Sequence, residues 1–237
     1  MSNHSVADYD KELETLGQKI AEMGGLAEKM LSDAMDALVD FDTNLAQATI
    51  NRDPRLDLLQ RDIEENAILA IARRAPMALD LREIISAIRI SGDLERIGDL
   101  AKNIAKRAIK ISTDVRIPRA IIGLKSMHES AAILLKDVLD AYAQRDVERA
   151  RSVWMFDAEL DALEDSIFRD LLTFMMEDPR HISFCAHLLF CAKNIERIGD
   201  HATNIAETVV YLVTGESLPI DRPKGKTLLS DSPSTVE

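Results

Sequence analysis

The stretch ERIGDLAKNIA at residues 95–105 returns as ERIGDHATNIA at residues 196–206, which is 101 positions further along the chain. Within it, Ile97, Ala101 and Ile104 recur at intervals of four and three, the spacing of one face of a helix. A shared pattern as long as ERIGD-x-A-x-NIA cannot be read as one accidental cluster of charges. It indicates that the chain contains two copies of one helical unit, and it marks the charged residues that both copies retain.

Helical spacing of apolar residues continues over nearly the whole chain. Leu16, Ile20 and Met23, for example, belong to one apolar stripe in the first predicted helix. Pro76 and Pro179 interrupt the pattern, because proline lacks a backbone donor and restricts the residue before it. The predicted helices cover residues 7–41, 44–74, 77–111, 119–143 and 146–176, and a sixth follows Pro179 and ends at residue 214.

Six helices in two groups of three predict an all-α fold of two tandem, pseudo-symmetric, antiparallel three-helix bundles. The aromatic content of 4% and the abundance of Ala, Leu and Ile favour helix packing over a sheet. We expect the first bundle over residues 7–112 and the second over residues 117–214. Residues 216–237 show no apolar period and are expected to form a flexible tail.

The net charge of −12 argues against nucleic acid as a partner, because a nucleic-acid-binding protein needs a basic face. Cations or basic protein surfaces fit this charge better. The sequence has neither the apolar core of a signal peptide nor an apolar run of roughly 18 residues, as a membrane span requires. We therefore expect a cytoplasmic protein. Cys185 and Cys191 lie six apart on a predicted helix, face different ways and are expected to be reduced thiols.

Pairs of carboxylates four residues apart occur at matching positions of the two units. Each pair shares one helix face, where like charges repel unless a cation compensates them. In an antiparallel bundle two such pairs can meet, and oxygen donors of this kind suit Mg²⁺, Ca²⁺, Mn²⁺ or iron. The candidate metal ligands are Asp53, Asp57, Glu95 and Asp99 in the first unit, and Asp157, Asp161, Glu196 and Asp200 in the second.

A solvated acidic face is the alternative interpretation of these pairs. A chain with 41 acidic residues contains about four such pairs by composition alone, so their placement rather than their number supports a metal site. Gly98 and Gly199 lie inside the pairs, although mid-helix glycine costs about 1 kcal/mol relative to alanine. Either a neighbouring helix or an ion with its waters is expected to need this space. Arg96 and Arg197 either form ion pairs with nearby carboxylates, which we expect, or present their charge to a partner. His201 is either an additional ligand or a polar boundary residue.

The sequence contains no GxxxxGK[ST], GxGxxG, GxSxG or HExxH motif. Nucleotide binding through these loops and the corresponding nucleophilic or zinc chemistry are therefore not expected, and we predict a protein that is not an enzyme. Two alternatives remain open, a structural helical adaptor with or without metal and a carboxylate-bridged metalloenzyme.

These residues together resemble the PhoU family, over residues 8–214. The resemblance rests mainly on the repeated ERIGD-x-A-x-NIA. It also includes Met23-Gly24, Arg52-Asp53 with Asp57, and Pro76 followed by Asp80-Leu81-Arg82.

The resemblance implies a cytoplasmic regulator of phosphate homeostasis that represses the phosphate-starvation response. Such a protein links the ATPase subunit of the phosphate ABC importer to a phosphate-sensing histidine kinase, forms homodimers, and meets the membrane only through its partners. The resemblance also implies that the acidic pairs bind metal ions (Mg, Mn, Fe or Zn), with the identity of the ion left open. Because Leu100 in the first unit corresponds to His201 in the second, the two sites need not be equal.

Overall fold

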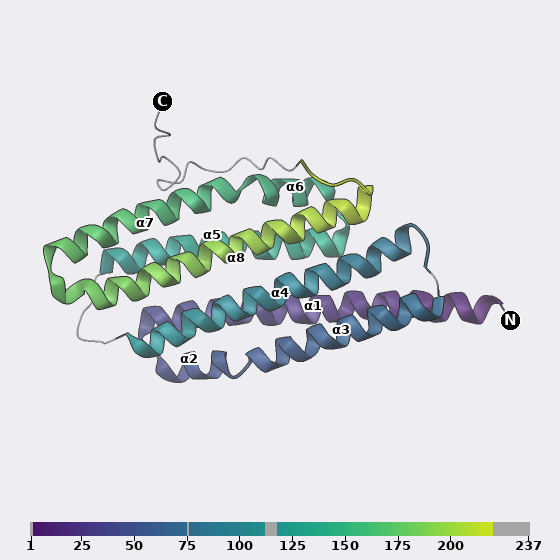
Figure 1. The fold of residues 1–237 in the computed structure, drawn as a ribbon, viewed down its shortest axis with the longest axis horizontal. Coiled ribbons are helices and arrows are strands. Elements are labelled where there is room, and N and C mark those ends of the chain that lie inside the picture. The colour runs from purple at the N-terminus through teal and green to yellow at the C-terminus, as the bar shows by residue number, and fades with distance from the viewer. Residues whose placement is uncertain (1, 75, 112–117, 220–237) are drawn as a thin grey trace, which may run out of the picture.

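The computed structural model describes residues 2–74, 76–111 and 118–219, and within these ranges the chain forms helices and no strand. Figure 1 shows two layers, one formed by α1 to α4 and the other by α5 to α8. The prediction of an all-α, duplicated fold is therefore confirmed. The elements are α1 (Ser2–Asp40), α2 (Thr43–Ile50), α3 (Asp53–Arg74), α4 (Leu79–Lys110), α5 (Pro118–Gln144), α6 (Val147–Met155), α7 (Asp157–Glu177), the 3₁₀ turn η1 (Pro179–His181) and α8 (Ile182–Thr214).

The two layers meet where α4 lies beside α8 and α1 beside α5 (Figure 1). Helices α4 and α8 run antiparallel, since Arg107 near the end of α4 contacts His187 near the start of α8. Between α1 and α5, a Cβ on Gly24 would lie 2.7 Å from a methyl carbon of Leu139, so the absence of a side chain allows a close approach. The buried apolar residues of both layers form one continuous core.

The second and fifth predicted helices are each divided in two, so the prediction of unbroken helices over 44–74 and 146–176 was wrong. At the first break the N–H of Arg52 bonds the carbonyl of Thr49, three residues back, at 3.1 Å. Pro54 then has no N–H to continue the helical pattern. At the second break the N–H of Phe156 donates to the carbonyl of Val153, again three residues back, at 3.2 Å. No proline lies near this second break. The break is thus a feature of the repeated unit and does not require proline.

Matching turns precede the two short helices. Phe41 and Arg145 have positive φ angles of 57° and 55°, which reverse the chain at the ends of α1 and α5. The next residue in each unit, Asp42 or Asp146, accepts hydrogen bonds from backbone N–H groups in the first turn of α2 or α6. Such N-caps satisfy donors that have no partner inside the helix. Both units therefore end their first long helix by the same device.

The proline interruptions are confirmed, with one change of boundary. Helix α4 begins at Leu79 and not at 77, because Ala78 adopts a φ of 45° after the break at Pro76. Pro179 opens a 3₁₀ turn that leads directly into α8. Gly215 ends α8 in the left-handed conformation, with a φ of 79°, as the sequence indicated. Of the predicted tail, residues 220–237 lie outside the described residues.

The apolar stripes predicted from sequence supply the core. Leu16, Ile20 and Met23 of α1 are fully buried, and so are Ile97 of α4 and Ile198 of α8 at equivalent repeat positions. Burying side chains of this size contributes roughly 1.5–3 kcal/mol each, which holds the long helices in register. Among the described helices, none combines the length and apolar character needed to cross a membrane.

Candidate metal centres in the two bundles

Glycines in the repeated motif let a neighbouring helix come close. A Cβ on Gly98 would overlap a methyl group of Leu56 on α3, and a Cβ on Gly199 would overlap a methyl group of Leu160 on α7. Of the two explanations that the sequence left open, the neighbouring helix is therefore correct for both positions. The close approach brings the start of α3 against α4, and the start of α7 against α8, which is where the carboxylate pairs lie.

In the first bundle a lysine joins two of the predicted ligands. The ammonium Nζ of Lys102 lies 2.6 Å from Oδ2 of Asp53 on α3 and 2.5 Å from Oδ1 of Asp99 on α4. Burial by itself would lower the pKa of Lys102, but hydrogen bonds from its ammonium to the two aspartates outweigh burial and raise that pKa. Lys102 is therefore charged and neutralises part of the cluster.

The other two ligands predicted in the first bundle lie beside this ion pair. Burial raises the pKa of Glu95, and the negative charges of Asp99 and Asp57 raise it further. Arg96 partly opposes this, with Nε 3.5 Å from Oε2 of Glu95 and Nη1 3.7 Å from Oδ2 of Asp99. The expected ion pairs of Arg96 are thus confirmed. The structure brings all four predicted carboxylates of the first bundle into one neighbourhood.

The second bundle repeats the arrangement with a different lysine. Nζ of Lys193 lies 2.9 Å from Oε1 of Glu196, while Oε2 of Glu196 is buried without a hydrogen-bond partner in the described structure. Burial raises the pKa of Glu196, and the charges of Asp200 and Asp161 add to that rise. Three of the four predicted ligands are therefore close together. Asp157 begins α7, but its side chain is not among those described.

The two clusters contain carboxylate oxygens, which are the ligands that hard cations prefer, but the described oxygens are not arranged closely enough to surround an ion. Within the described part of the chain, no three His, Cys, Asp or Glu side chains lie close enough together to hold an ion in this conformation. Carboxylate oxygens suit Mg²⁺, Mn²⁺ or iron, and the unpartnered buried Oε2 of Glu196 fits such an ion in the second bundle. In the first bundle the ammonium of Lys102 already lies between Asp53 and Asp99.

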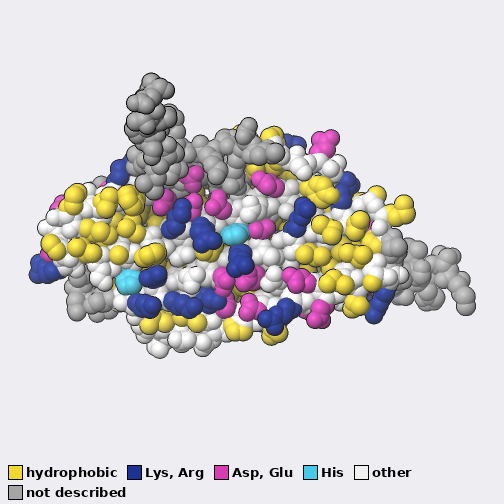
Figure 2. Space-filling model, in the orientation of Figure 1, with side chains coloured by type: hydrophobic (Ala, Val, Ile, Leu, Met, Phe, Trp, Pro, Cys, Tyr) yellow, Lys and Arg dark blue, Asp and Glu magenta, His cyan; other side chains and the backbone are white. Residues whose placement is uncertain are grey.

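The surface around the clusters mixes both signs of charge. In Figure 2 acidic side chains (magenta) gather near the middle of the face, with Lys and Arg side chains among and beside them. The interpretation as an entirely solvated acidic face therefore does not describe this region, because several of the carboxylates are paired and partly buried.

His201 has a contact that the sequence did not reveal. Its Nδ1 lies 2.9 Å from Oδ1 of Asp93 on α4, and Asn204 donates to the same oxygen at 3.4 Å. Both contacts join the two bundles. The structure thus gives His201 a partner in the other bundle, at a position where the first unit has Leu100, and favours the boundary residue over the additional metal ligand.

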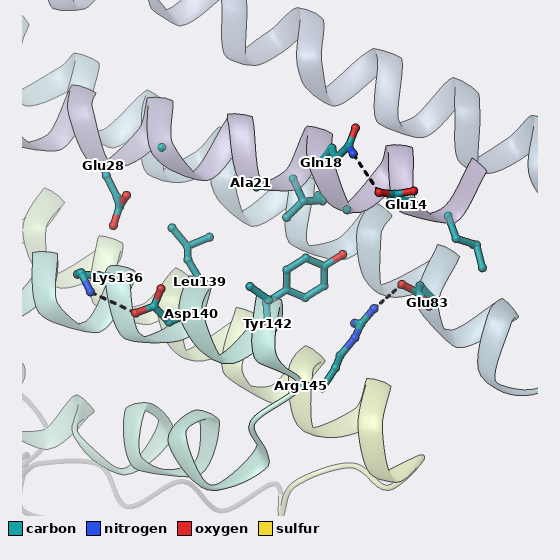
Figure 3. A pocket seen from close by; sticks show the side chains of 15 residues that line it. Glu14, Gln18, Ala21, Glu28, Glu83, Lys136, Leu139, Asp140, Tyr142 and Arg145 are labelled. Atoms are coloured by element: carbon teal, nitrogen blue, oxygen red, sulfur yellow. Dashed lines mark hydrogen bonds and ion pairs between the residues drawn. The ribbon is translucent and has the colours of Figure 1, made fainter. Parts of the chain in front are cut away.

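A separate groove of about 600 Å³ lies between α1 and α5, away from the eight predicted ligands. In Figure 3, Leu139 and Tyr142 of α5 face α1 across it, while Arg145 forms an ion pair with Glu83 of α4 at one end. Burial raises the pKa of Tyr142, so its phenol stays protonated near neutral pH. The groove combines an apolar floor with paired charges on its rim.

Lys102, Lys193 and Leu160 are the site residues that sequence reasoning missed. The only sequence signal was the spacing of the two lysines. Lys102 follows Asp99 by three positions, and Lys193 precedes Glu196 by three, so each shares a helix face with its carboxylate. The contact of Lys102 with Asp53 depends on how α3 packs against α4, which spacing within one helix does not give.

Known proteins resemble the chain in both sequence and structure. A family model described as "PhoU domain" matches residues 20–108 and again residues 124–209. The phosphate-specific transport system accessory protein PhoU homolog of Rhizobium meliloti (strain 1021) is 55% identical over 222 residues, which cover 93% of each chain. The homolog of the same name from Caulobacter vibrioides (strain NA1000 / CB15N) is 48% identical, over 94% of this chain and 97% of the relative.

Two crystal structures share the fold. That of PhoU from Pseudomonas aeruginosa superposes with a TM-score of 0.85 at 40% identity, covering 88% of this chain and 100% of the other. That of the phosphate transport system regulatory protein PhoU from Streptococcus pneumoniae gives a TM-score of 0.83 at 29% identity, covering 90% and 100%. The similarity therefore extends over both bundles.

Proposed function

Because the chain belongs to the PhoU family, we propose that it is an accessory regulator of phosphate transport. The observation that carries this proposal is the match of the family to both halves of the chain, together with relatives named for the phosphate-specific transport system. Because the relatives are named as accessory proteins, a regulatory role is favoured over a catalytic role for this chain. No feature of the described clusters favours the carboxylate-bridged metalloenzyme.

The finer proposal is an adaptor in the cytoplasm. One face of the helical layers binds the ATPase subunit of the phosphate ABC importer, and another binds the sensor histidine kinase, so that the phosphate-starvation response is repressed while phosphate is plentiful. The shared core of the two bundles supports this role, because a rigid body can transmit the state of one partner to another. A homodimer would present each face twice.

The carboxylate clusters are proposed to hold metal ions, with Mg²⁺ or Mn²⁺ the simplest occupants and iron or zinc the others that family resemblance suggests. The chemistry of the donors supports this, and so does the buried, unpartnered oxygen of Glu196. A bound ion would cancel repulsion among the carboxylates and fix α3 on α4 and α7 on α8. Elemental analysis of protein purified without chelator or affinity tag tests it.

Deletion of the gene in the parent organism tests the regulatory proposal. A reporter of a phosphate-starvation gene should become active in high phosphate after deletion, and the wild-type chain supplied in trans should restore repression. Unchanged reporter activity in the deletion strain would refute the signalling role. A pulldown from extracts of cells grown in high and low phosphate should recover the importer ATPase and the kinase, and light scattering of the purified chain should give the mass of a dimer.

A further inference from the structure

The last turns of α4 and the first turns of α8, which lie side by side, are basic in an otherwise acidic chain. No Asp or Glu occurs in the sequence between Asp99 and the end of α4, or between Asp178 and Glu196, although the net charge of the chain is −12. Lys106 and Lys110 on α4 are exposed. Figure 2 shows a row of Lys and Arg side chains at the left of the face, where α4 ends.

Arg107 connects these cations to the exposed apolar surface of α8. Its guanidinium carbon lies 4.3 Å from the centre of the Phe190 ring, and its Nη1 lies 3.3 Å from Nδ1 of His187. Burial lowers the pKa of His187, and the positive charges of Arg107 and Lys110 lower it further, so both cations lie close to α8. The Phe190 ring is still 55% exposed and therefore lies on the surface beside the cations.

Exposed apolar side chains also flank η1, the turn between α7 and α8. Met176 at the end of α7 is 78% exposed, and Ile182 at the start of α8 is 50% exposed. Of the two carboxylates in this turn, Asp178 pairs with Arg180 at 2.6 Å, and Glu177 is exposed. Figure 2 shows hydrophobic side chains (yellow) gathered at this end of the face, above the row of Lys and Arg. Large apolar side chains exposed together mark a surface that another molecule covers.

The other end of the molecule, where α3 connects to α4, provides a comparison (Figure 1). It is similarly apolar, because Met77 is 80% exposed and Leu79 is 53% exposed. Its charges are mixed, since Asp80 and Glu83 lie in the first turns of α4 together with Arg82. The two ends therefore differ in charge more than in apolar exposure.

We propose that the end of the molecule formed by α4, α7 and α8 binds directly to an anionic phospholipid surface. The lysines of α4 would lie at the level of the headgroup phosphates, and Met176, Ile182 and Phe190 would enter the boundary between headgroups and acyl chains. This inference goes beyond the proposed function, in which the chain meets the membrane only through its partners.

Charge complementarity favours a lipid surface as the occupant. The acidic remainder of the chain is repelled by anionic lipid, so the basic end is the part that turns toward it. A peptide helix is recognised in a groove, and none of the five residues that define this end (Lys106, Lys110, Met176, Ile182 and Phe190) lines the groove between α1 and α5. A bilayer needs no groove, because its lipids rearrange around apolar side chains that project from a helix end.

Sedimentation of the full-length chain with vesicles tests the proposal. The chain should bind vesicles of phosphatidylglycerol and phosphatidylcholine in equal parts, should not bind phosphatidylcholine alone, and should dissociate as salt is added. Replacing Lys106 and Lys110 by Gln should weaken binding roughly fivefold for each lysine. The charge-matched control replaces Lys11 and Lys136, which are exposed on α1 and α5, and should bind like the wild type.

Apolar contact is tested separately from charge. Ile182→Ser should weaken vesicle binding roughly tenfold, while Leu79→Ser at the other end should leave it unchanged. A polarity-sensitive fluorophore on Met176→Cys should shift its emission to shorter wavelength when the mixed vesicles are added, and the same label on Met77→Cys should not. Labelling is selective because Cys185 and Cys191 are buried, and circular dichroism verifies the fold of each variant.

Four results would overturn the inference. The first is equal binding to the two vesicle compositions, and the second is wild-type affinity of the variant that lacks Lys106 and Lys110. The third is an equal emission shift of the labels at the two ends. The fourth is a chain that ignores vesicles but forms a dimer which Ile182→Asp dissociates in light scattering, because the surface would then join two copies. The starvation-gene reporter measures regulation of phosphate transport independently of all four.

Discussion

Replacing Gly98 by alanine would place a methyl group where a methyl of Leu56 already lies. Alanine favours a helix over glycine by about 1 kcal/mol, so without the neighbour this change would stabilise α4. Overpacking a well-filled core costs about 1–3 kcal/mol. The steric cost exceeds the helical gain, and the expected net loss is about 1 kcal/mol. For a chain of this size that corresponds to a fall in Tm of about 2–4 °C.

Gly92 on the same helix provides the matched control. An added Cβ there has no heavy atom within 4 Å, so Gly92→Ala should stabilise the protein by about 1 kcal/mol. The two alanine substitutions share the gain in helix propensity and differ in the contact with Leu56. Thermal unfolding followed by circular dichroism should therefore shift Tm downward for the first and upward for the second.

A double substitution tests the assigned cause. Leu56→Ala alone should cost about 2–5 kcal/mol, because it leaves a cavity in the core. In that background Gly98→Ala should become stabilising, since its methyl enters space that the leucine has vacated. Two results would refute the argument that contact with Leu56 requires glycine at position 98. One is a rise in Tm when Gly98→Ala is made in the wild type, and the other is a fall in Tm when it is made in the Leu56→Ala background.

Three further predictions concern buried polar groups. Cys185 and Cys191 are buried, and burial raises the pKa of Cys191 to about 12, so neither thiol should react with an alkylating reagent at pH 8 until denaturant is added, as mass spectrometry would show. Burial lowers the pKa of His128 below its usual value near 6.5, so the unfolded chain takes up this proton first as the pH falls. The stability that neutral His128 contributes is fully present above pH 6.5, and it is lost as the pH falls from 6.5 to the lower pKa of the folded state. A His128→Gln variant should therefore lose less stability in urea between pH 7 and pH 5 than the wild type. Asp33 is buried and forms an ion pair with Arg52. Asp33→Ala should therefore lower the free energy of unfolding, measured in urea, by about 2 kcal/mol. If Arg52→Ala left the free energy of unfolding almost unchanged, the ion pair would not be important for stability.

Sequence patterns predicted the helices well because the relevant forces are local. The apolar stripe of α1, the proline breaks and the glycine cap after α8 each depend on residues within a few positions of one another. The breaks after α2 and α6 were missed. The second break has no proline to mark it, and both are set by the three-residue turns that orient α3 and α7 toward their neighbours.

The candidate site was only partly predictable. The spacing within α4 placed Glu95 and Asp99 on one face, and duplication identified Glu196 and Asp200 as their equivalents. The same spacing could not decide whether Gly98 faces an ion or a neighbouring side chain, because that depends on the distance between two helices.

The sequence by itself determined that the chain is a duplicated helical unit, which faces of its helices are apolar, and which carboxylates recur. The tertiary structure decided which charged and polar groups those carboxylates contact. Lys102 bridges two helices in one bundle, while the other bundle has a buried threonine at the equivalent position and an exposed lysine at the other end of the motif. The physical reason is that the energy of a charge depends on its distance from other charges and from water, and packing between helices sets both.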